Sequence, residues 1–361
     1  MGHFIVIAGG GTGGHVFPGL AVAAELRRRD PSGEILFLGS EKGLETRLVP
    51  AAGFALRTLR LGGLAGKTAS AAALSAWRAT LAVVRCLGMF LRRRPAAVVG
   101  VGGFASGPAV LAALLLRVPT LIHEQNATPG LTNRWLAPFV DEIAVSFPGT
   151  ETVLRGRGAV TGNPIRAEFF AIPPYAGPGA RLRVLIFGGS RGARALNQAA
   201  AAALARLAPA KQRLAIVHQT GEADLAATRD AYARSGLEAT VLPFLDDMPA
   251  RLAAADLVIC RSGAGTVFEL AAAGRASILV PYPLAAGRHQ EKNARWMAAA
   301  GAAEVVLNQD LTGERLATLI EGALAAPQVL VSRAAAARAL ARPDAAAAIA
   351  SMTEGLAGGS R

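Results

Sequence analysis

The sequence predicts an α/β fold of two domains, each built around a parallel sheet. With 361 residues, the chain is longer than one hydrophobic core usually organises, so two domains are expected. Short apolar runs alternate with longer helical stretches, which is the pattern of parallel strands joined by crossover helices. Two of these runs, Phe4–Ala8 and Arg183–Phe187, lead straight into a glycine cluster and then a helix. We therefore expect two domains that open alike.

The expected strands form two series, and their near-continuous apolar character is typical of strands covered on both faces. The first series comprises Phe4–Ala8, Ile35–Leu38, Val98–Val101, Thr120–His123 and Glu142–Val145, and the second comprises Arg183–Phe187, Leu214–His218, Thr240–Leu242, Leu257–Cys260 and Ser277–Val280. A segment rich in glycine and proline, Thr161 to Gly179, separates them. We place the boundary near Gly162, with domains over residues 1–162 and 163–342 and an alanine-rich helix over about 343–361.

The formal net charge of +13 is carried mostly by arginine and favours an anionic partner, such as a phosphorylated substrate or an acidic lipid headgroup. Nucleic acid is not expected, because basic and aromatic residues do not interleave. The two cysteines are far apart, so neither a disulfide framework nor a zinc site is expected. The chain opens on a strand rather than a signal peptide and has no uninterrupted apolar run of about 18 residues, which predicts a cytoplasmic protein without a membrane span.

The first glycine cluster satisfies the pattern GxGxxG at Gly9, Gly11 and Gly14. Glycines there let backbone N–H groups approach a diphosphate at the start of a helix. A dinucleotide site, with Glu41 on the ribose, and a turn that only packs strand on helix both fit the pattern. His15 adds an imidazole suited to proton transfer near neutral pH, although it could also be a histidine that merely packs at a helix start.

Two further glycine-bearing helix starts lie in the second half. In Gly188–Arg194, the Ser190 hydroxyl can cap the helix or bind a phosphate oxygen. In Arg261–Thr266, N–H groups and a hydroxyl again precede a helix, and Glu269 follows close to the same end. A carboxylate there can accept hydrogen bonds from a ribose diol, or it can simply complement the helix dipole.

Polar clusters lie beside these starts. His123 to Asn126 follow an expected strand, at the end where open α/β sheets place their ligands. Gln290, in a polar cluster after Pro283, suits sugar hydroxyls because an amide both donates and accepts, although an ordinary solvated helix start fits too. No Asp-x-Asp motif is present, so we expect helix termini and arginines, without a metal, to stabilise a departing diphosphate.

The segment from Leu74 to Arg94 combines apolar residues with arginines spaced by about two helical turns. The residues on which this pattern depends are Trp77, Arg78, Leu81, Val84, Arg85 and Arg92. Such a helix could lie in a membrane interface with its arginines at acidic headgroups. A crossover helix packed on the sheet is the alternative.

Taken together, the motifs resemble one family. GGGTGGHVFPGLA, GGFASGP, HEQNATPGLTN, GNPIR, GGSRGAR, FLDDM, RSGAGTVFELAAAG and HQEKNA occur in the order found in undecaprenyl-diphospho-muramoylpentapeptide β-N-acetylglucosaminyltransferases. These peptidoglycan enzymes convert lipid I to lipid II. The resemblance extends from Ile5 to about Asn308.

The resemblance implies a GT-B fold, in which two Rossmann-like domains face each other across a cleft and the C-terminal helix returns to the first domain. The second domain would bind UDP-N-acetylglucosamine. Its implied contacts are Ser190, Ser262, Gly263, Ala264, Gly265 and Thr266 at the diphosphate with Arg166 nearby, Glu269 at the ribose, Leu245 at the uracil and Gln290 at the sugar. Thr12, Gly13, Gly14, His15 and Asn126 would face the reacting centre and the acceptor diphosphate.

The implied reaction moves N-acetylglucosamine from UDP to the muramoyl C4 hydroxyl of lipid I with inversion, and no cofactor is expected. A base must take the hydroxyl proton; we expect His15, with Glu124 as the alternative. The segment around Leu74 to Arg94 corresponds to the family's membrane-association region, which implies a peripheral protein at an anionic membrane surface, on its cytoplasmic face. Arg191, Gly265 and Ala286-Gly287 depart from residues common in the family, which affects details of the donor contacts.

Three other functions fit part of the pattern. A nucleotide-dependent oxidoreductase could use the Gly9–Gly14 loop. Another GT-B enzyme could glycosylate a natural product or a diacylglycerol, although HEQNATPGLTN and GGTGGH disfavour it. A non-catalytic membrane-binding protein would account for the arginines and the apolar helix alone.

Overall fold

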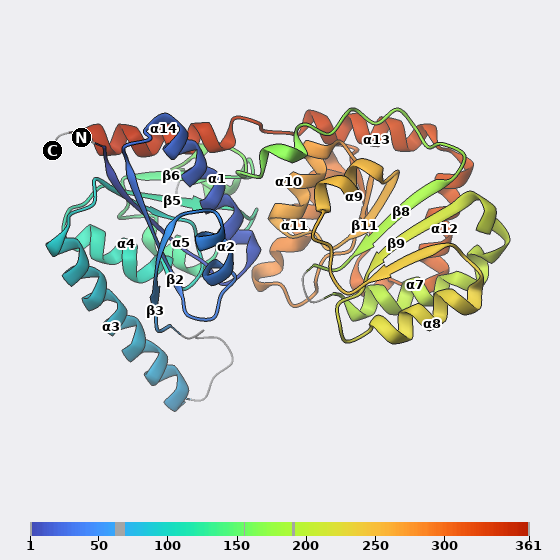
Figure 1. The fold of residues 1–361 in the computed structure, drawn as a ribbon, viewed down its shortest axis with the longest axis horizontal. Coiled ribbons are helices and arrows are strands. Elements are labelled where there is room, and N and C mark those ends of the chain that lie inside the picture. Colours follow the sequence, from blue (N-terminus) through green and yellow to red (C-terminus); the bar gives the residue numbers. More distant parts are fainter. Residues whose placement is uncertain (1, 62–68, 155, 190–191, 360–361) are drawn as a thin grey trace. The chain divides into compact units, whose positions relative to one another are not determined.

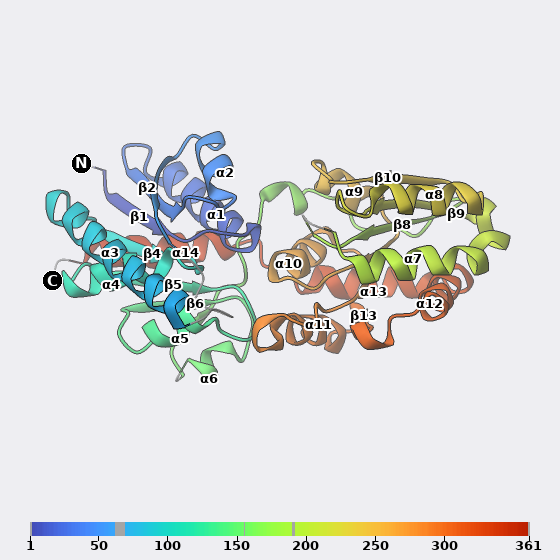
Figure 2. The same cartoon turned by 90° about the horizontal axis from the view of Figure 1, so that it is seen from below.

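A computed structural model describes residues 2–61, 69–154, 156–189 and 192–359, with side chains omitted for residues 69–73. The chain forms two compact units (Figures 1 and 2). The first comprises Met1–Arg166 and Arg342–Arg361, and the second comprises Ala167–Ala341. Each contains one parallel sheet flanked by helices, so the α/β class expected from the sequence is confirmed.

The sheet of the first unit has seven parallel strands in the order β3-β2-β1-β4-β5-β6-β7. The strands are β1 Phe4–Ala8, β2 Glu34–Ser40, β3 Ala55–Leu59, β4 Ala97–Gly100, β5 Thr120–Glu124, β6 Glu142–Val145 and β7 Ala159–Val160. The helices are α1 Gly13–Arg29, α2 Glu45–Ala51, α3 Ala69–Arg92, α4 Ser106–Leu115, α5 Leu131–Leu136, α6 Thr150–Val153 and the C-terminal α14 Ala345–Gly358.

Alternate residues of β1 enter two separate cores, because side chains on a strand point to opposite faces in turn. Val6 packs into the core beneath α3 and α4, whereas Ile7 packs into the core beneath α1, α2 and α14. Helix α14 follows the second unit in the chain yet packs on α1, β4 and β5 of the first, with Ile349 fully buried (Figure 1). The first sheet is therefore covered on both faces.

The sheet of the second unit has six parallel strands in the order β10-β9-β8-β11-β12-β13. These are β8 Leu182–Phe187, β9 Leu214–Gln219, β10 Ala239–Leu242, β11 Leu257–Cys260, β12 Ser277–Leu279 and β13 Ala303–Val305. The helices are α7 Arg194–Leu207, α8 Leu225–Ser235, α9 Met248–Ala254, α10 Ala264–Ala273, α11 His289–Ala299, α12 Gly313–Ala325 and α13 Gln328–Ala339, with short 3-10 turns η1 Ala167–Phe169, η2 Ala208–Arg213, η3 Ala286–Arg288 and η4 Asn308–Asp310.

Every strand expected from the sequence is present, with ends within two residues, and three strands were missed: β3, β7 and β13. All three lie at sheet edges. An edge strand has only one neighbour and is less covered: in β3 only the last residue, Leu59, is buried, and β7 is exposed throughout. Continuous apolar runs are most pronounced in strands that are buried on both faces, although the edge strand β10 was also predicted.

Both sheets reverse their strand order at the first strand. In the first unit, β1 lies between β2 and β4, and in the second, β8 lies between β9 and β11. At such a switch point, the loops that follow the two central strands diverge at the carboxyl edge of the sheet and leave a crevice for ligands. The three glycine-bearing helix starts singled out in the sequence follow β1, β8 and β11.

Small residues bring α7 and α12 close together. A Cβ built at Gly313, the first residue of α12, would lie 2.5 Å from the Cβ of Ala202 and 2.6 Å from its backbone carbon. We therefore predict that Gly313→Ala lowers the free energy of unfolding by about 1–3 kcal/mol. Gly322→Ala in the same helix is the matched control, because nothing lies within 4 Å of its Cβ and alanine favours a helix by up to about 1 kcal/mol. Urea denaturation measures both; equal stabilities would contradict the prediction.

Candidate active site

The first glycine loop connects β1 to α1 at the carboxyl edge of the sheet. Thr12 is the N-cap of α1, and its carbonyl accepts from the backbone N–H groups of His15 and Val16. Gly11, Thr12 and Gly14 are exposed, whereas His15 is half-buried. The loop therefore presents backbone donors to solvent and holds the histidine partly inside the unit.

A buried carboxylate fixes this loop from below. Glu45, the first residue of α2, is 1% exposed and accepts hydrogen bonds from the Gly11 N–H at 2.8 Å, the Ser40 N–H at 2.7 Å and the Ser40 hydroxyl at 2.7 Å. Any side chain at Gly10, Gly39 or Gly43 would collide with it. These hydrogen bonds lower the pKa of Glu45 against the opposing effect of burial. Glu45 was not among the residues singled out from the sequence. Its one signal there is an acidic residue at the start of a helix, which is common and does not indicate a role in a loop.

The hydrogen bond to Glu45 and the position of Glu41 bear on whether the first glycine loop fits a dinucleotide. The Gly11 N–H is taken by Glu45, so the donors left for an anion are those at the start of α1. Glu41, the residue that a dinucleotide site would need, pairs with Arg60 at 3.1 Å on the surface. Both observations favour an anion at the helix start over a dinucleotide laid along the loop.

The imidazole of His15 is held between two neighbouring loops. Its Nδ1 lies 3.1 Å from Oε1 of Gln125, which follows β5. Gly102, which follows β4, has a φ of +83°, and a Cβ there would lie 2.8 Å from the same Nδ1. The three residues come from the loops after β1, β4 and β5, which are neighbours in the sheet. The absence of a side chain at Gly102 is what allows the ring to lie there.

Glu124 accepts hydrogen bonds from the loop that follows it and from α5. Its carboxylate is 2% exposed and accepts from the backbone N–H of Asn126 at 2.9 Å, the backbone N–H of Gly130 at 3.0 Å and Nδ2 of Asn133 at 2.8 Å. The carboxylate thus joins the start of the loop to α5 and places Asn126, which is half-buried, next to Gln125. Arg166, at the end of the first unit, has its guanidinium 5.4 Å from the ring centre of Phe17 on α1.

In the second unit, the turn between β11 and α10 has its N-cap at Gly263. Gly263, Gly265, Thr266 and Glu269 are half-buried, and Ala264 is buried. Thr266 and Glu269 are three residues apart and so share one face of α10. Leu245, in the loop after β10, is 6% exposed.

Ser262 is fully buried, and its hydroxyl donates to the backbone carbonyl of Gln290 at 2.8 Å. Asn293 donates to the Ser262 carbonyl at 3.1 Å, so the start of α11 is tied to the turn before α10. The side-chain oxygen of Gln290 accepts from the backbone N–H of Tyr282 at 2.9 Å. The structure thus brings Ser262 and Gln290 together, and it uses the Ser262 hydroxyl in folding.

Ser190 and Arg191 lie outside the described residues. Around them, the backbone is tightly constrained: a Cβ at Gly192, whose φ is +72°, would overlap the carbonyl oxygen of Thr220, and the Gly188 N–H donates to Oε1 of Gln219 at 3.3 Å. The second glycine loop therefore packs closely on the end of β9.

Electrostatics at two helix starts favour anions. The first turns of α1 and α10, which lie in described parts of the chain, hold no acidic residue. The positive ends of both helix dipoles are therefore uncompensated from within those turns. Among the residues that the structure describes, no group of three or more His, Cys, Asp or Glu is placed to hold a metal ion.

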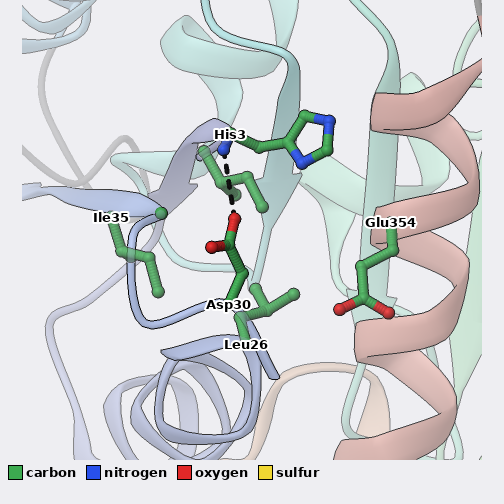
Figure 3. A pocket seen from close by; sticks show the side chains of 7 residues that line it. His3, Leu26, Asp30, Ile35 and Glu354 are labelled. Atoms are coloured by element: carbon green, nitrogen blue, oxygen red, sulfur yellow. Dashed lines mark hydrogen bonds between the residues drawn. The ribbon is translucent and has the colours of Figure 1, made fainter. Parts of the chain in front are cut away.

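A small cavity of about 30 Å³, room for about one water molecule, lies at the opposite end of the first sheet (Figure 3). His3, Leu26, Asp30, Ile35 and Glu354 line it, and the backbone N–H of His3 donates to the Asp30 carboxylate at 3.2 Å. The cavity lies where α1, β1, β2 and α14 meet, away from the carboxyl ends of the strands. It is a packing gap at the amino ends of β1 and β2, whereas the glycine loop follows the carboxyl end of β1.

Both halves of the chain match models of glycosyltransferase domains. The model of the glycosyltransferase family 28 N-terminal domain matches residues 5–145, and that of the family 28 C-terminal domain matches residues 183–349. The UDP-N-acetylglucosamine–N-acetylmuramyl-(pentapeptide) pyrophosphoryl-undecaprenol N-acetylglucosamine transferase of Syntrophotalea carbinolica is 47% identical, over 93% of this chain and 94% of that protein. The chain belongs to this transferase family.

Other relatives agree with this assignment. The transferase of the same name from Solibacter usitatus is 46% identical over 98% of this chain and 96% of its own length. The crystal structure of Acinetobacter baumannii MurG superimposes with a TM-score of 0.78 at 34% identity, covering 98% of this chain and 99% of that one. The family resemblance, the GT-B class of two Rossmann-like units and the N-acetylglucosaminyltransferase class expected from the sequence are confirmed.

The hydrogen bond from the Gly11 N–H to the Glu45 carboxylate should make the free energy of unfolding depend on pH in the acid range. Folding lowers the pKa of Glu45 from its ordinary value of 4.5, so its contribution is complete above about pH 4.5 and is lost as the pH falls through the folded-state pKa. We expect Glu45→Gln to lower the free energy of unfolding by about 1–3 kcal/mol at pH 7, and by less at pH 3–4. The amide keeps one acceptor oxygen, but its NH₂ faces donors that the second carboxylate oxygen accepted from.

Denaturant titrations at both pH values measure this difference. Glu142→Gln, at an exposed position on β6 of the same unit, is the matched control and should change little at either pH. A Glu45→Gln protein as stable as the parent at pH 7 would show that the hydrogen bonds of the Glu45 carboxylate contribute nothing.

Proposed function

We propose that this enzyme transfers N-acetylglucosamine from UDP-N-acetylglucosamine to the C4 hydroxyl of the muramoyl sugar of lipid I, giving lipid II. The observation that carries the proposal is the near-full-length identity of 46–47% to transferases whose names state this donor and this acceptor. In this proposal, the first unit binds the acceptor and the membrane, and the second unit binds UDP-N-acetylglucosamine.

On the donor side, we assign the diphosphate to the start of α10 and to Ser190 and Arg166. Gly263 and Gly265 support this role, since nothing lies within 4 Å of a Cβ at either position and the helix dipole there is not offset within its first turn. Glu269 would hold the ribose, the backbone around Leu245 the uracil, and Gln290 the sugar. Ser262 would contribute by positioning the turn before α10 rather than by its hydroxyl, which donates to the backbone carbonyl of Gln290.

On the acceptor side, Thr12, Gly13 and Gly14 would receive the acceptor diphosphate at the start of α1, and Asn126 would contact the acceptor. His15 would take the proton from the muramoyl hydroxyl as that oxygen attacks the anomeric carbon, while the helix dipole at α10 stabilises the departing UDP. The alternative base, Glu124, is poorly suited because three donors already engage its carboxylate.

Helix α3 is proposed to lie against the membrane surface. Trp77, Leu81 and Val84 are exposed, as are Arg78 and Arg85, whereas the opposite face places Ala82, Cys86 and Phe90 in the core beneath α4. Exposed apolar residues continue onto α4 at Leu111 and Leu115 and beyond it to Trp135 and Phe139, and these helices pack in series.

By length and composition, the part of α3 from Leu74 to Arg92 would suffice to cross a membrane, which the sequence analysis did not expect. Its packing in the first unit favours a position along the surface, since one face is already committed to the protein core. An apolar face bordered by arginines suits an interface that contains anionic headgroups. We therefore propose a peripheral enzyme at the cytoplasmic face of the cell membrane.

Replacing the proposed base tests the mechanism. With UDP-N-acetylglucosamine and a lipid I analogue, we expect His15→Ala to lower kcat by about 10²–10⁴-fold, the usual contribution of a positioned base. The affinity for UDP, measured by calorimetry, should change little. His3→Ala replaces an exposed histidine of the same unit and should keep parental turnover. Near-parental turnover in His15→Ala would remove this residue from the mechanism.

A second experiment tests the membrane surface. We expect the double variant Trp77→Glu, Val84→Glu to lose binding to vesicles of phosphatidylcholine and phosphatidylglycerol while retaining turnover of a water-soluble acceptor analogue. The same charge placed at Val329→Glu, an exposed apolar position of the second unit, is the control and should leave vesicle binding intact. Co-sedimentation with the vesicles measures binding, and binding of the parent protein should weaken as salt screens the arginines. If the double variant sedimented with the vesicles as the parent does, the membrane assignment would be contradicted.

A further inference from the structure

We propose that Gln125 is a positioning residue that fixes the tautomer of His15, with the proton on Nδ1 and the basic lone pair on Nε2, and that the buried His123 and Ser146 hold Gln125 in the required orientation. The inference deepens the proposed function and rests on it, because it specifies which nitrogen of His15 would accept the substrate proton. It concerns four residues that lie along the carboxyl edge of the first sheet.

The main chain after β4 fixes the orientation of the Gln125 amide. Its Nε2 lies 3.0 Å from the carbonyl oxygen of Val101, which follows β4. A carbonyl oxygen can only accept, so the group that faces it must be the NH₂ and not the oxygen of the amide. Gln125 is 1% exposed, and a flipped amide would bury two oxygens against each other. The main chain after β4 therefore sets this amide.

The orientation of the amide determines the protonation of His15. With its NH₂ towards Val101, Gln125 presents Oε1 to Nδ1 of His15 at 3.1 Å. An amide oxygen has no hydrogen to donate, so Nδ1 must carry the proton. In a neutral imidazole, the other nitrogen is then the base. Gly102 adds a steric restraint, since its backbone lies against the ring so closely that a Cβ would be 2.8 Å from Nδ1 and 2.9 Å from Cε1.

The second hydrogen of the Gln125 amide points to His123. Nε2 of Gln125 lies 3.0 Å from Nδ1 of His123, and Nε2 of His123 lies 3.0 Å from the Ser146 hydroxyl. Nδ1 of His123 must therefore accept, and its Nε2 must carry the hydrogen. His123 is fully buried, and this burial lowers its pKa to about 3. It is thus neutral at physiological pH and can accept, whereas a protonated His123 would confront the amide hydrogens with another donor.

The order of strands makes this chain of hydrogen bonds possible. His15, Val101, Gln125 and Ser146 follow β1, β4, β5 and β6 respectively, and these four strands are consecutive in the sheet. An amide, unlike a carboxylate, orients an imidazole without adding a negative charge. The Gln125 amide therefore selects the Nδ1–H tautomer of His15 without placing a negative charge next to the proposed diphosphate.

The tautomers can be read directly from the full-length protein labelled with ¹⁵N-histidine. Long-range ¹H–¹⁵N spectra distinguish Nδ1–H from Nε2–H imidazoles, and the chain has 5 histidines, which single His→Ala variants assign. We expect His15 in the Nδ1–H form and His123 in the Nε2–H form. His15 in the Nε2–H form in the parent protein would overturn the proposal.

His218 in the second unit is an internal reference for these spectra. Nδ2 of Asn197 donates to the Thr220 carbonyl and to Asp224, so Oδ1 of Asn197 must accept from Nε2 of His218 at 3.0 Å. Burial lowers the pKa of His218 to about 4. We therefore expect a constant Nε2–H signal from His218 in the parent and in every variant of the first unit.

Two variants then test the role of Gln125. Gln125→Met keeps the length of the side chain but removes the acceptor. We expect the His15 signal to lose its Nδ1–H character and kcat to fall about 10- to 100-fold, less than the loss of the base itself, with KM for UDP-N-acetylglucosamine unchanged. Gln125→Glu keeps an acceptor for Nδ1 of His15 but loses the NH₂ that faces Val101 and His123, so we expect it to lose the fixed orientation and to lower kcat as well. An unchanged His15 tautomer in Gln125→Met would refute the positioning role.

These outcomes can be separated from a failure of the proposed function. The spectra report the tautomer whether or not the protein turns over lipid I. If His15→Ala were fully active while the parent showed the Nδ1–H form, the positioning would stand as a structural fact and the base assignment would fail. If His15→Ala were inactive and the parent showed the Nε2–H form, the reverse would hold.

Discussion

The strand order at the centre of the first sheet is the constraint on which the candidate site depends. Because β1 is followed in space by β4, β5 and β6, loops that are far apart in the sequence meet at one carboxyl edge. The glycine loop with His15, the loop of Val101 and Gly102, and the loop that starts at Gln125 become neighbours there. The second sheet repeats the order, and its switch point sets the turn before α10 beside the loop after β8.

Buried polar groups hold these loops in place. Glu45 ties the glycine loop to the end of β2, Glu124 ties the loop after β5 to α5, and Gln125 ties that same loop to Val101. Each of these side chains is nearly inaccessible to solvent, and a buried polar group is costly unless its bonds are made. The loops therefore have few alternatives to the observed arrangement, so the backbone donors at the start of α1 are preorganised for an anion.

Two buried carboxylates, Glu45 and Glu124, lie at the edge of the sheet where we propose that the acceptor diphosphate binds. Glu45 and Glu124 each accept at least two hydrogen bonds from backbone N–H groups, and these donors partly offset the negative charge locally. The basic excess of the chain, +13 in total, also favours phosphorylated ligands at longer range. We infer that the carboxylates act as internal anchors, while the helix starts and arginines face the substrates.

Much of the fold was predictable from the sequence, because apolar runs bounded by glycine mark strands that are buried on both faces. Three of the four edge strands, β3, β7 and β13, were not predicted, and β3 and β7 leave most of their side chains exposed. For the site, the glycine loops and His15 could be singled out by residue type. The partners of His15 could not, because Gln125 is 110 residues away. The three donors to the Glu124 carboxylate and the bond from the Ser262 hydroxyl to the Gln290 carbonyl could not be predicted either, because they depend on how the loops fold.

The proposed reaction is a single inverting transfer of N-acetylglucosamine to the muramoyl acceptor. The most direct measurement is the anomeric configuration of the product formed from UDP-N-acetylglucosamine and a lipid I analogue, determined by NMR alongside the amount of UDP released. The account predicts one UDP per disaccharide and a β-linked sugar at the muramoyl C4 oxygen. An α-linked product, or release of UDP without a disaccharide, would contradict it.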